Sequence, residues 1–126
     1  MSVVLDASAV LALLRGEGGA EVVAQLARGA ALLTVNAAEV MQRMRSLGVA
    51  SEAVLQDIAR LEIAIVPFSL RHATIAAALR EPTRGRGLGL ADRACLALAI
   101  DRGWTVLTAD ALWTEVDTGA NIRLIR

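Results

Sequence analysis

The feature that most constrains the fold of this chain is the alternation of short apolar runs with longer helical patterns. The apolar runs predict strands over 3–6, 31–35, 63–68, 104–108 and 121–125. The segments between them predict helices over 7–15, 20–28, 36–47, 51–61, 70–80 and 91–102, with a short helical turn around Leu112. Strands that alternate with helices are joined by right-handed crossovers. We therefore expect an α/β fold, a three-layer sandwich with a mostly parallel central sheet flanked by helices on both faces.

Glycine and serine residues set the expected ends of several of these helices. Gly16 is expected to end the first helix, and Gly48 the helix that starts at Asn36, because glycine commonly follows the last helical residue. Ser51 and Ser69 are expected to cap the helices that begin beside them, since a serine oxygen accepts a hydrogen bond from a free backbone N–H.

Composition favours one soluble domain over 1–126. The 126 residues can bury roughly two thirds of the unfolded surface. Charged residues interrupt every apolar run before it reaches the ~20 residues of a membrane helix, and no basic region precedes the first apolar stretch. We therefore expect a cytoplasmic protein without membrane contact. Cys95 is the only cysteine, which excludes an internal disulfide framework and a zinc cluster built on cysteines.

The charges balance overall but not locally. Thirteen acidic residues offset thirteen arginines, and there is no lysine, so the net charge gives no case for a polyanionic partner. The segment 71–93, by contrast, is locally basic. Its arginines are candidates for contacts with the phosphates of a nucleic acid backbone, in particular Arg80, Arg84, Arg86 and Arg93.

Acidic residues stand where the predicted strands end. Asp6 follows the apolar residues of the first strand, Asp110 follows the fourth, and Glu39 lies in the first turn of the helix after the second. Because sites in parallel sheets form beyond the carboxyl ends of the strands, we expect these acids to share one edge. Asp92 opens a helix, so the loop 81–90 must bring it to that edge.

Each acid also has a purely structural interpretation. Asp6 and Asp92 could cap helices, and Asp110 could stabilise a turn. Asn36 and Glu39 have the spacing of a capping box. Taken together, however, converging carboxylates repel one another unless a proton or a cation neutralises them. The usual hard cation for carboxylate oxygens and water is Mg²⁺ or Mn²⁺.

Four motifs, in order and spacing, resemble those of the PIN-domain ribonucleases, and most closely the VapC toxins of bacterial toxin–antitoxin pairs. The motifs are "VLDASAVLALL", "TVNAAEV", "GLADRACLALA" and "VLTAD…W", and the resemblance covers the whole chain. It implies a PIN-like fold and a metal-dependent endoribonuclease that cleaves RNA phosphodiester bonds with an activated water. It also implies a cognate antitoxin and a homodimer.

By this resemblance Asp6, Glu39, Asp92 and Asp110 would be both the catalytic acids and the ligands of Mg²⁺ or Mn²⁺. Asp6 and Asp92 would be the main direct ligands, and the supporting hydroxyls near the metal would be those of Ser8 and Thr108. The chain departs from the family at Gly89, where the family often has Ser. A glycine there bears on the rigidity of the loop before Asp92 and removes no acid.

Other reactive residues have structural interpretations. Cys95 lies on an apolar helix face and is expected in the core, while His72 is expected to be an exposed residue in the first turn of its helix. Asp101 is expected to be solvated. A phosphoryl-transfer site of the receiver or aspartate-phosphatase type would use a lysine, which is absent, and the phosphatases need a second Asp where Ser8 stands. The alternative that remains is a noncatalytic PIN-fold module that binds protein or RNA.

Overall fold

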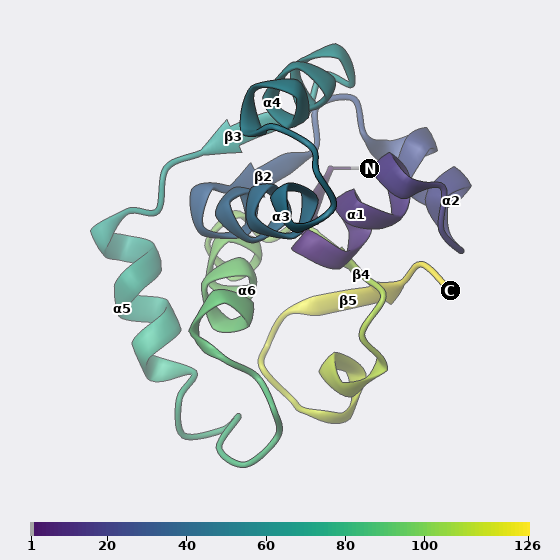
Figure 1. Cartoon of the computed structure of the whole chain (residues 1–126). Helices are drawn as coiled ribbons and strands as arrows, with labels where there is room; N and C mark the ends of the chain where they lie inside the picture. Colours follow the sequence, from purple (N-terminus) through teal and green to yellow (C-terminus); the bar gives the residue numbers. More distant parts are fainter. Residues whose placement is uncertain (1) are drawn as a thin grey trace.

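The computed structural model describes residues 2–126 and contains one five-stranded sheet in the order β3-β2-β1-β4-β5 (Figure 1). Every pair of neighbouring strands is parallel, as expected. The strands are β1 (Val3–Leu5), β2 (Ala31–Leu33), β3 (Ala64–Val66), β4 (Thr105–Thr108) and β5 (Asn121–Leu124). The chain builds outward from β1 through β2 to β3 and then returns to the other side of β1 with β4. The order of the sheet therefore reverses between β1 and β4, where open parallel sheets form their ligand sites.

Helices cover both faces of the sheet, which confirms the three-layer prediction. The helices are α1 (Ala7–Arg15), α2 (Ala20–Leu26), α3 (Thr34–Ser46), α4 (Ser51–Arg60), α5 (Leu70–Ala78) and α6 (Leu90–Arg102), with a 3₁₀ turn η1 (Ala111–Glu115). Val3 and Leu5 of β1 pack with buried residues of α1 to α4, whereas Val4 between them packs with α6 and η1. This period of two follows from the pleat of a strand. None of the helices in residues 2–126 is both long enough and apolar enough to cross a membrane.

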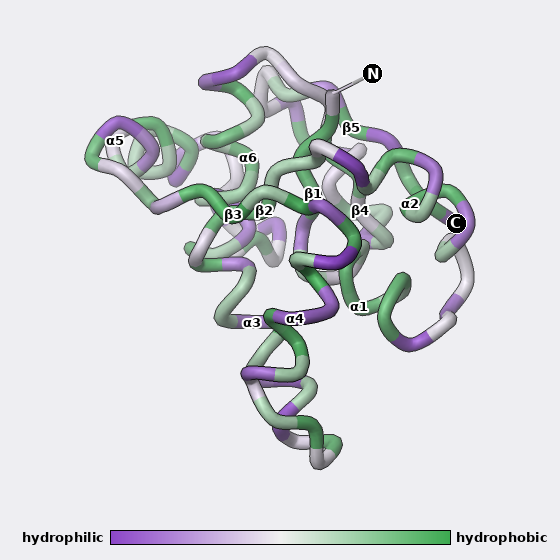
Figure 2. Tube along the Cα trace, turned by 90° about the horizontal axis from the view of Figure 1, so that it is seen from above, coloured by the Kyte–Doolittle hydropathy of each residue, from purple (hydrophilic) through white to green (hydrophobic). Residues whose placement is uncertain are grey.

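Each face of the sheet has its own buried core. On the α6 side the core includes Cys95, which is completely buried as predicted, and Trp113 of η1. Figure 2 shows the central strands as a predominantly apolar band and the α3/α4 hairpin projecting from the body of the molecule. The short strands β1 and β2 are buried along their whole length, which is typical of a sheet covered on both sides.

The predicted start of α3 and the predicted cap of α4 were wrong. Helix α3 begins at Thr34 and not at Asn36, because β2 ends at Leu33 and the Thr34 hydroxyl accepts a hydrogen bond from the Phe68 N–H (3.1 Å). Ser51 is the first residue of α4, and the position before the helix belongs to Ala50, which makes no side-chain cap.

The predicted roles of Gly16, Gly48 and Ser69 at helix ends are confirmed. Gly16 ends α1 in the left-handed conformation, Gly48 follows the last turn of α3 with φ +84°, and Ser69 accepts a hydrogen bond from the backbone N–H of His72. His72 itself is buried, which corrects the expected exposure. Its Nδ1 accepts from the Ser69 N–H, and its Nε2 lies 3.5 Å from Asp101, which also pairs with Arg71 and is thus not simply solvated.

Candidate functional site

Asp6 lies directly after β1, at the point where the sheet order reverses, and its carboxylate is held by several donors. Oδ1 accepts from the Ala9 N–H at 2.8 Å and from the Ser8 hydroxyl at 2.7 Å, while Oδ2 accepts from the Thr108 hydroxyl at 2.5 Å. Asp6 therefore caps α1, as its structural interpretation predicted, but it also joins the ends of two strands. The residue is only 5% exposed.

The two supporting hydroxyls form a link between the first turn of α1 and the end of β4. The Ser8 hydroxyl accepts from the Ala109 N–H at 2.8 Å, and the Thr108 hydroxyl accepts from the Asp110 N–H at 3.0 Å. The sequence predicted Ser8 and Thr108 as neighbours of the acids, and the structure brings both against Asp6. The parallel register of β1 and β4, which pairs Leu5 with Leu107, places them there.

Burial raises the pKa of the Asp6 carboxyl above its ordinary value, and the nearby charge of Glu39 adds to this effect. The hydrogen bonds from Thr108, Ser8 and Ala9 oppose it because they favour the charged form, but burial dominates. Asp6 is thus a buried carboxylate that lacks a cation to compensate it among its hydrogen-bond partners.

Asp92 lies in the first turn of α6, and its Oδ2 accepts from the Gly89 N–H at 3.2 Å. Burial and the charges of the other acids raise its pKa to about 6; those charges are on Glu39, Asp6 and Asp110. The loop before α6 therefore brings Asp92 to the predicted edge, near enough to the other acids for their charges to act on it. We call Asp6, Glu39, Asp92 and Asp110 the acidic cluster.

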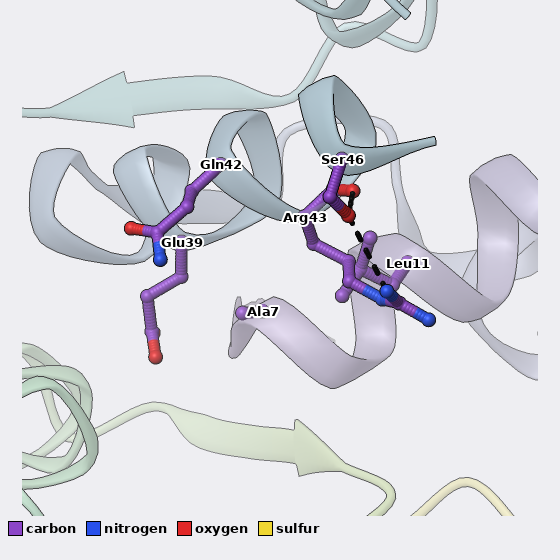
Figure 3. A pocket seen from close by; sticks show the side chains of 6 residues that line it. All are labelled: Ala7, Leu11, Glu39, Gln42, Arg43 and Ser46. Atoms are coloured by element: carbon purple, nitrogen blue, oxygen red, sulfur yellow. Dashed lines mark hydrogen bonds between the residues drawn. The ribbon is translucent and has the colours of Figure 1, made fainter. Parts of the chain in front are cut away.

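Glu39 lies on α3, and its Oε1 accepts from Nδ2 of Asn36 at 2.9 Å. Asn36 is inside the helix and not at its cap, so the predicted capping box is absent. Figure 3 shows the Glu39 side chain extending from α3 past Ala7, at the start of α1, while Arg43 turns toward Ser46. Glu39 lines a cavity of about 440 Å³ between these two helices, together with Ala7, Leu11, Gln42, Arg43 and Ser46.

Asp110 caps η1 from the position directly before it, where its Oδ1 accepts from the Leu112 N–H at 3.0 Å, as its structural interpretation predicted. Its backbone N–H is bound by Thr108, so the same hydroxyl contacts Asp6 and positions Asp110. The capping role and the place in the acidic cluster are therefore compatible.

The arginine candidates fall into two groups. Arg80, Arg84 and Arg86 are exposed at or near the turns that precede α6, and Arg84 pairs with Glu81 at 3.7 Å. Arg93 is half-buried against α5, where it donates to the Ala76 carbonyl at 3.4 Å. Only the first group presents guanidinium groups at the surface.

The donor set of the acidic cluster fits a hard divalent cation. All its ligand atoms would be carboxylate oxygens, which Mg²⁺ and Mn²⁺ prefer. Burial raises the pKa values of Asp6 and Asp92, and the neighbouring acids add to this effect, so a cation would stabilise the charged form of both. Among residues 2–126, no three His, Cys, Asp or Glu side chains lie close enough to hold a metal ion jointly.

Sequence reasoning missed the role of one buried residue. Asn36 was interpreted only as a helix cap, yet its Nδ2 also donates to the Ala91 carbonyl at 3.1 Å, directly before Asp92. The spacing of Asn36 and Glu39 was the signal that these two side chains interact. Nothing in the sequence indicated the contact with α6, which spans 55 positions.

These observations define a class of protein: an α/β sandwich whose acids gather where the order of a parallel sheet reverses. The family model of the PIN domain matches residues 3–119, and the chain belongs to the PIN domain family. This confirms the family that the four sequence motifs predicted.

Several solved structures share this fold. A toxin–antitoxin complex from Klebsiella pneumoniae is 17% identical, with a TM-score of 0.79 and 98% of each chain covered. DNA-bound VapBC from Salmonella typhimurium is 14% identical, with a TM-score of 0.76, covering 100% of this chain and 99% of that one. FitAcB from Neisseria gonorrhoeae is 24% identical, with a TM-score of 0.69 and 95% of each chain covered. No curated protein matches the chain in sequence.

Proposed function

We propose that this PIN-domain protein is a metal-dependent endoribonuclease that acts as the VapC-type toxin of a toxin–antitoxin pair. The observation that carries the proposal is the position of the Asp6 carboxylate, which is buried where the sheet order reverses between β1 and β4 and is bound by the Ser8 and Thr108 hydroxyls. A carboxylate cluster at the edge of a PIN-domain sheet is suited to bind a cation and to act on a phosphodiester.

The four carboxylates have complementary parts in this proposal. Asp6, Glu39, Asp92 and Asp110 are the proposed ligands of Mg²⁺ or Mn²⁺, which would supply an activated water and stabilise the departing oxygen. Because no three of these side chains lie close enough in the described residues to hold a metal jointly, binding would have to draw them together. Asp6 offers a fixed carboxylate because Ser8 and Thr108 hold it. Above pH 6, Asp92 is mostly ionised and free to act as a ligand.

The exposed arginines near the turns before α6 support RNA as the substrate. Arg80, Arg84 and Arg86 would contact phosphates, which positions a strand without reading its sequence. Stacking of bases on aromatic side chains would contribute little to RNA affinity. Besides His72, the chain has only three aromatic residues, Phe68, Trp104 and Trp113, and Trp113 is buried. Specificity would then depend on groove shape and on RNA structure.

A cognate antitoxin and a second copy of the chain are the proposed protein partners. The similar solved structures include toxin–antitoxin complexes, which supports the first. Several large apolar side chains remain exposed and could be covered by partners: Leu47, Leu55, Ile65, Leu70, Leu90 and Leu112. A small reading frame directly upstream would support the pairing, and co-purification of its product with this chain would test it.

The decisive test uses the protein purified free of antitoxin. Incubated with structured RNA and Mn²⁺ or Mg²⁺, it should cleave internal phosphodiester bonds, and chelation should stop the reaction. Asp6→Asn should abolish cleavage and the toxicity of the expressed protein. Cleavage that survives chelation contradicts the metal mechanism. RNA binding without cleavage in the native protein favours the noncatalytic module instead.

A further inference from the structure

One buried amide connects two elements that carry acids of the cluster. Asn36 is 1% exposed, and its Nδ2 donates one hydrogen bond to Oε1 of Glu39 at 2.9 Å and another to the Ala91 carbonyl at 3.1 Å. Ala91 directly precedes Asp92 in α6. A single NH₂ group thus holds the Glu39 carboxylate and the first turn of α6 in one arrangement.

The chemistry of the two partners fixes which way this amide faces. A carboxylate oxygen and a backbone carbonyl are both acceptors, so only the NH₂ side of Asn36 can bind them. With the amide reversed, its oxygen would face two other oxygens. The Oδ1 atom is left buried and without a donor, which costs free energy. The Asn36 amide therefore leaves its oxygen unpaired, while its NH₂ group donates to both Glu39 and Ala91.

Glu39 depends on this contact for its orientation. Within the described residues 2–126, the bond from Asn36 is the only hydrogen bond that the Glu39 side chain makes. A glutamate without it would sample several rotamers, and ordering them on cation binding would cost free energy. The bond occupies Oε1 and leaves Oε2 without a partner.

We propose that Asn36 is a positioning residue that orients the Glu39 carboxylate for a divalent cation and ties it to the first turn of α6. The proposal rests on the proposed function, since it assumes that the acidic cluster binds a cation. Asn36 itself would not contact the cation. Residues that orient metal ligands typically change metal affinity by about 10–100-fold when they are replaced.

The test is a double-mutant cycle between Asn36 and Glu39 with Mn²⁺ alone as the probe. The affinity is obtained from the electron paramagnetic resonance signal of free Mn²⁺, with RNA cleavage as a second readout. Asn36→Ala should weaken Mn²⁺ binding about 10-fold. In the Glu39→Ala background the same change should have no further effect, because the carboxylate that Asn36 orients is gone.

Two more variants separate positioning from folding. Asn36→Leu retains the branched shape of the side chain and removes the donors. Once urea denaturation shows that it folds, it should show the same loss of Mn²⁺ affinity as Asn36→Ala. Thr34→Ala is the matched control, because it removes a hydrogen bond from the same first turn of α3 without touching an acid. It should leave the Mn²⁺ affinity unchanged.

The outcomes distinguish this proposal from the proposed function. An equal loss of affinity in both backgrounds would mean that Asn36 does not act through Glu39, and an unchanged affinity in Asn36→Leu would mean that the amide orients nothing. Either result overturns the inference and leaves the nuclease proposal standing. If the native chain binds no Mn²⁺ and cleaves no RNA, both proposals fail.

Discussion

Asp6 and Asp92 belong to the same acidic cluster but are held in very different ways. Two hydroxyls and one backbone N–H bind the Asp6 carboxylate; Ser8 and Ala9 lie in the first turn of α1, and Thr108 is the last residue of β4. Asp92 has one backbone N–H, from a glycine in the loop that leads into its helix. The Asp6 carboxylate is therefore fixed beside the ends of β1 and β4, whereas the position of the Asp92 carboxylate depends on the loop before α6.

This difference predicts that the two acids contribute differently to stability and to cation binding. Strands β1 and β4 are neighbours in register, so the residues after them are placed by the sheet itself. Helix α6 begins after turns rich in glycine, and burial, together with the charges of the other acids, raises the pKa of its Asp92 to about 6. Asp6 should thus contribute to stability as well as to cation binding, and Asp92 mainly to cation binding.

The largest expected effect compares Asp6→Ala with Asp92→Ala. Both should lower cleavage of RNA about 10³-fold, within the range typical of a lost catalytic group. Only Asp6→Ala should also lower the free energy of unfolding, by about 2 kcal/mol, because it removes the cap of α1 and leaves the buried Thr108 hydroxyl without its acceptor. Cleavage assays and urea denaturation measure the two effects.

Asp92→Ala should leave stability near the native value without added metal. It loses one hydrogen bond but also removes a charge that three other acids repel. If both variants lost stability equally, the contrast between the strand-held and the loop-delivered acid would be wrong.

A smaller effect is expected for Thr108→Val, which keeps the shape of the side chain and removes its hydroxyl. The Asp110 N–H would lose its acceptor and the Asp6 carboxylate one donor, which should cost about 1–3 kcal/mol of unfolding free energy. Cleavage should fall about 10–100-fold because the orientation of two acids is loosened.

Thr83→Val is the matched control for this variant. Thr83 is similarly buried, but its hydroxyl donates to the Leu79 carbonyl and contacts no acid. Its replacement should reduce stability while leaving the cleavage rate near native. A native cleavage rate in Thr108→Val would show that its hydroxyl does not orient the acids.

The pH dependence of stability should reveal the raised pKa of Asp92. Its pKa is about 6 in the folded protein against an ordinary value of 3.8, so between these values the folded state binds more protons than the unfolded state. Stability should therefore fall as the pH rises through this window. Because Asp92 is partly exposed, water screens the neighbouring charges, and the expected loss is about 1 kcal/mol.

The measurement compares native protein with Asp92→Asn in the presence of a chelator. The amide of this variant carries no charge, so the difference in unfolding free energy should grow in favour of the variant from about pH 4 to about pH 7. Added Mn²⁺ should reverse the difference, since it stabilises only the carboxylate. A difference that does not change with pH would contradict the raised pKa.

The sequence predicted the sheet and the location of the acids for physical reasons that are local. Apolar runs such as the one ending at Leu5 specify buried strands, and the position of Asp6 directly after that run determines its edge. The strand β2 was predicted too long because Thr34 and Val35 have strand propensity, while tertiary contacts start α3 at Thr34.

Contacts between distant parts of the chain could not be read in this way. His72 looks like an exposed helix residue from its own neighbours, but α5 packs on α6 and buries it beside Asp101. The contact of Asn36 with Ala91 likewise depends on how α3 and α6 pack across the sheet edge. Neither side chain has a periodicity that indicates a partner so far along the chain.

The smallest expected effect concerns Gly89, the residue before α6. Asp92 accepts from the Gly89 N–H, but Gly89 has no side chain to accept from the Asp92 N–H in return. Its φ of −77° suits any residue, and an added Cβ would meet nothing within 4 Å. Gly89→Ser should complete the capping box and raise the free energy of unfolding by about 0.5 kcal/mol.

Thermal unfolding would register this gain as a rise in Tm of roughly 2 °C. Gly87→Ser is the control with the opposite sign, because Gly87 has φ +75° and a side chain there is strained although its Cβ would have room. If Gly89→Ser left Tm unchanged, the loop would already hold α6 as firmly as a cap can. Asp6 and Asp92 would then differ only in the number of hydrogen bonds that each carboxylate accepts, and not in the flexibility of the chain segment that precedes Asp92.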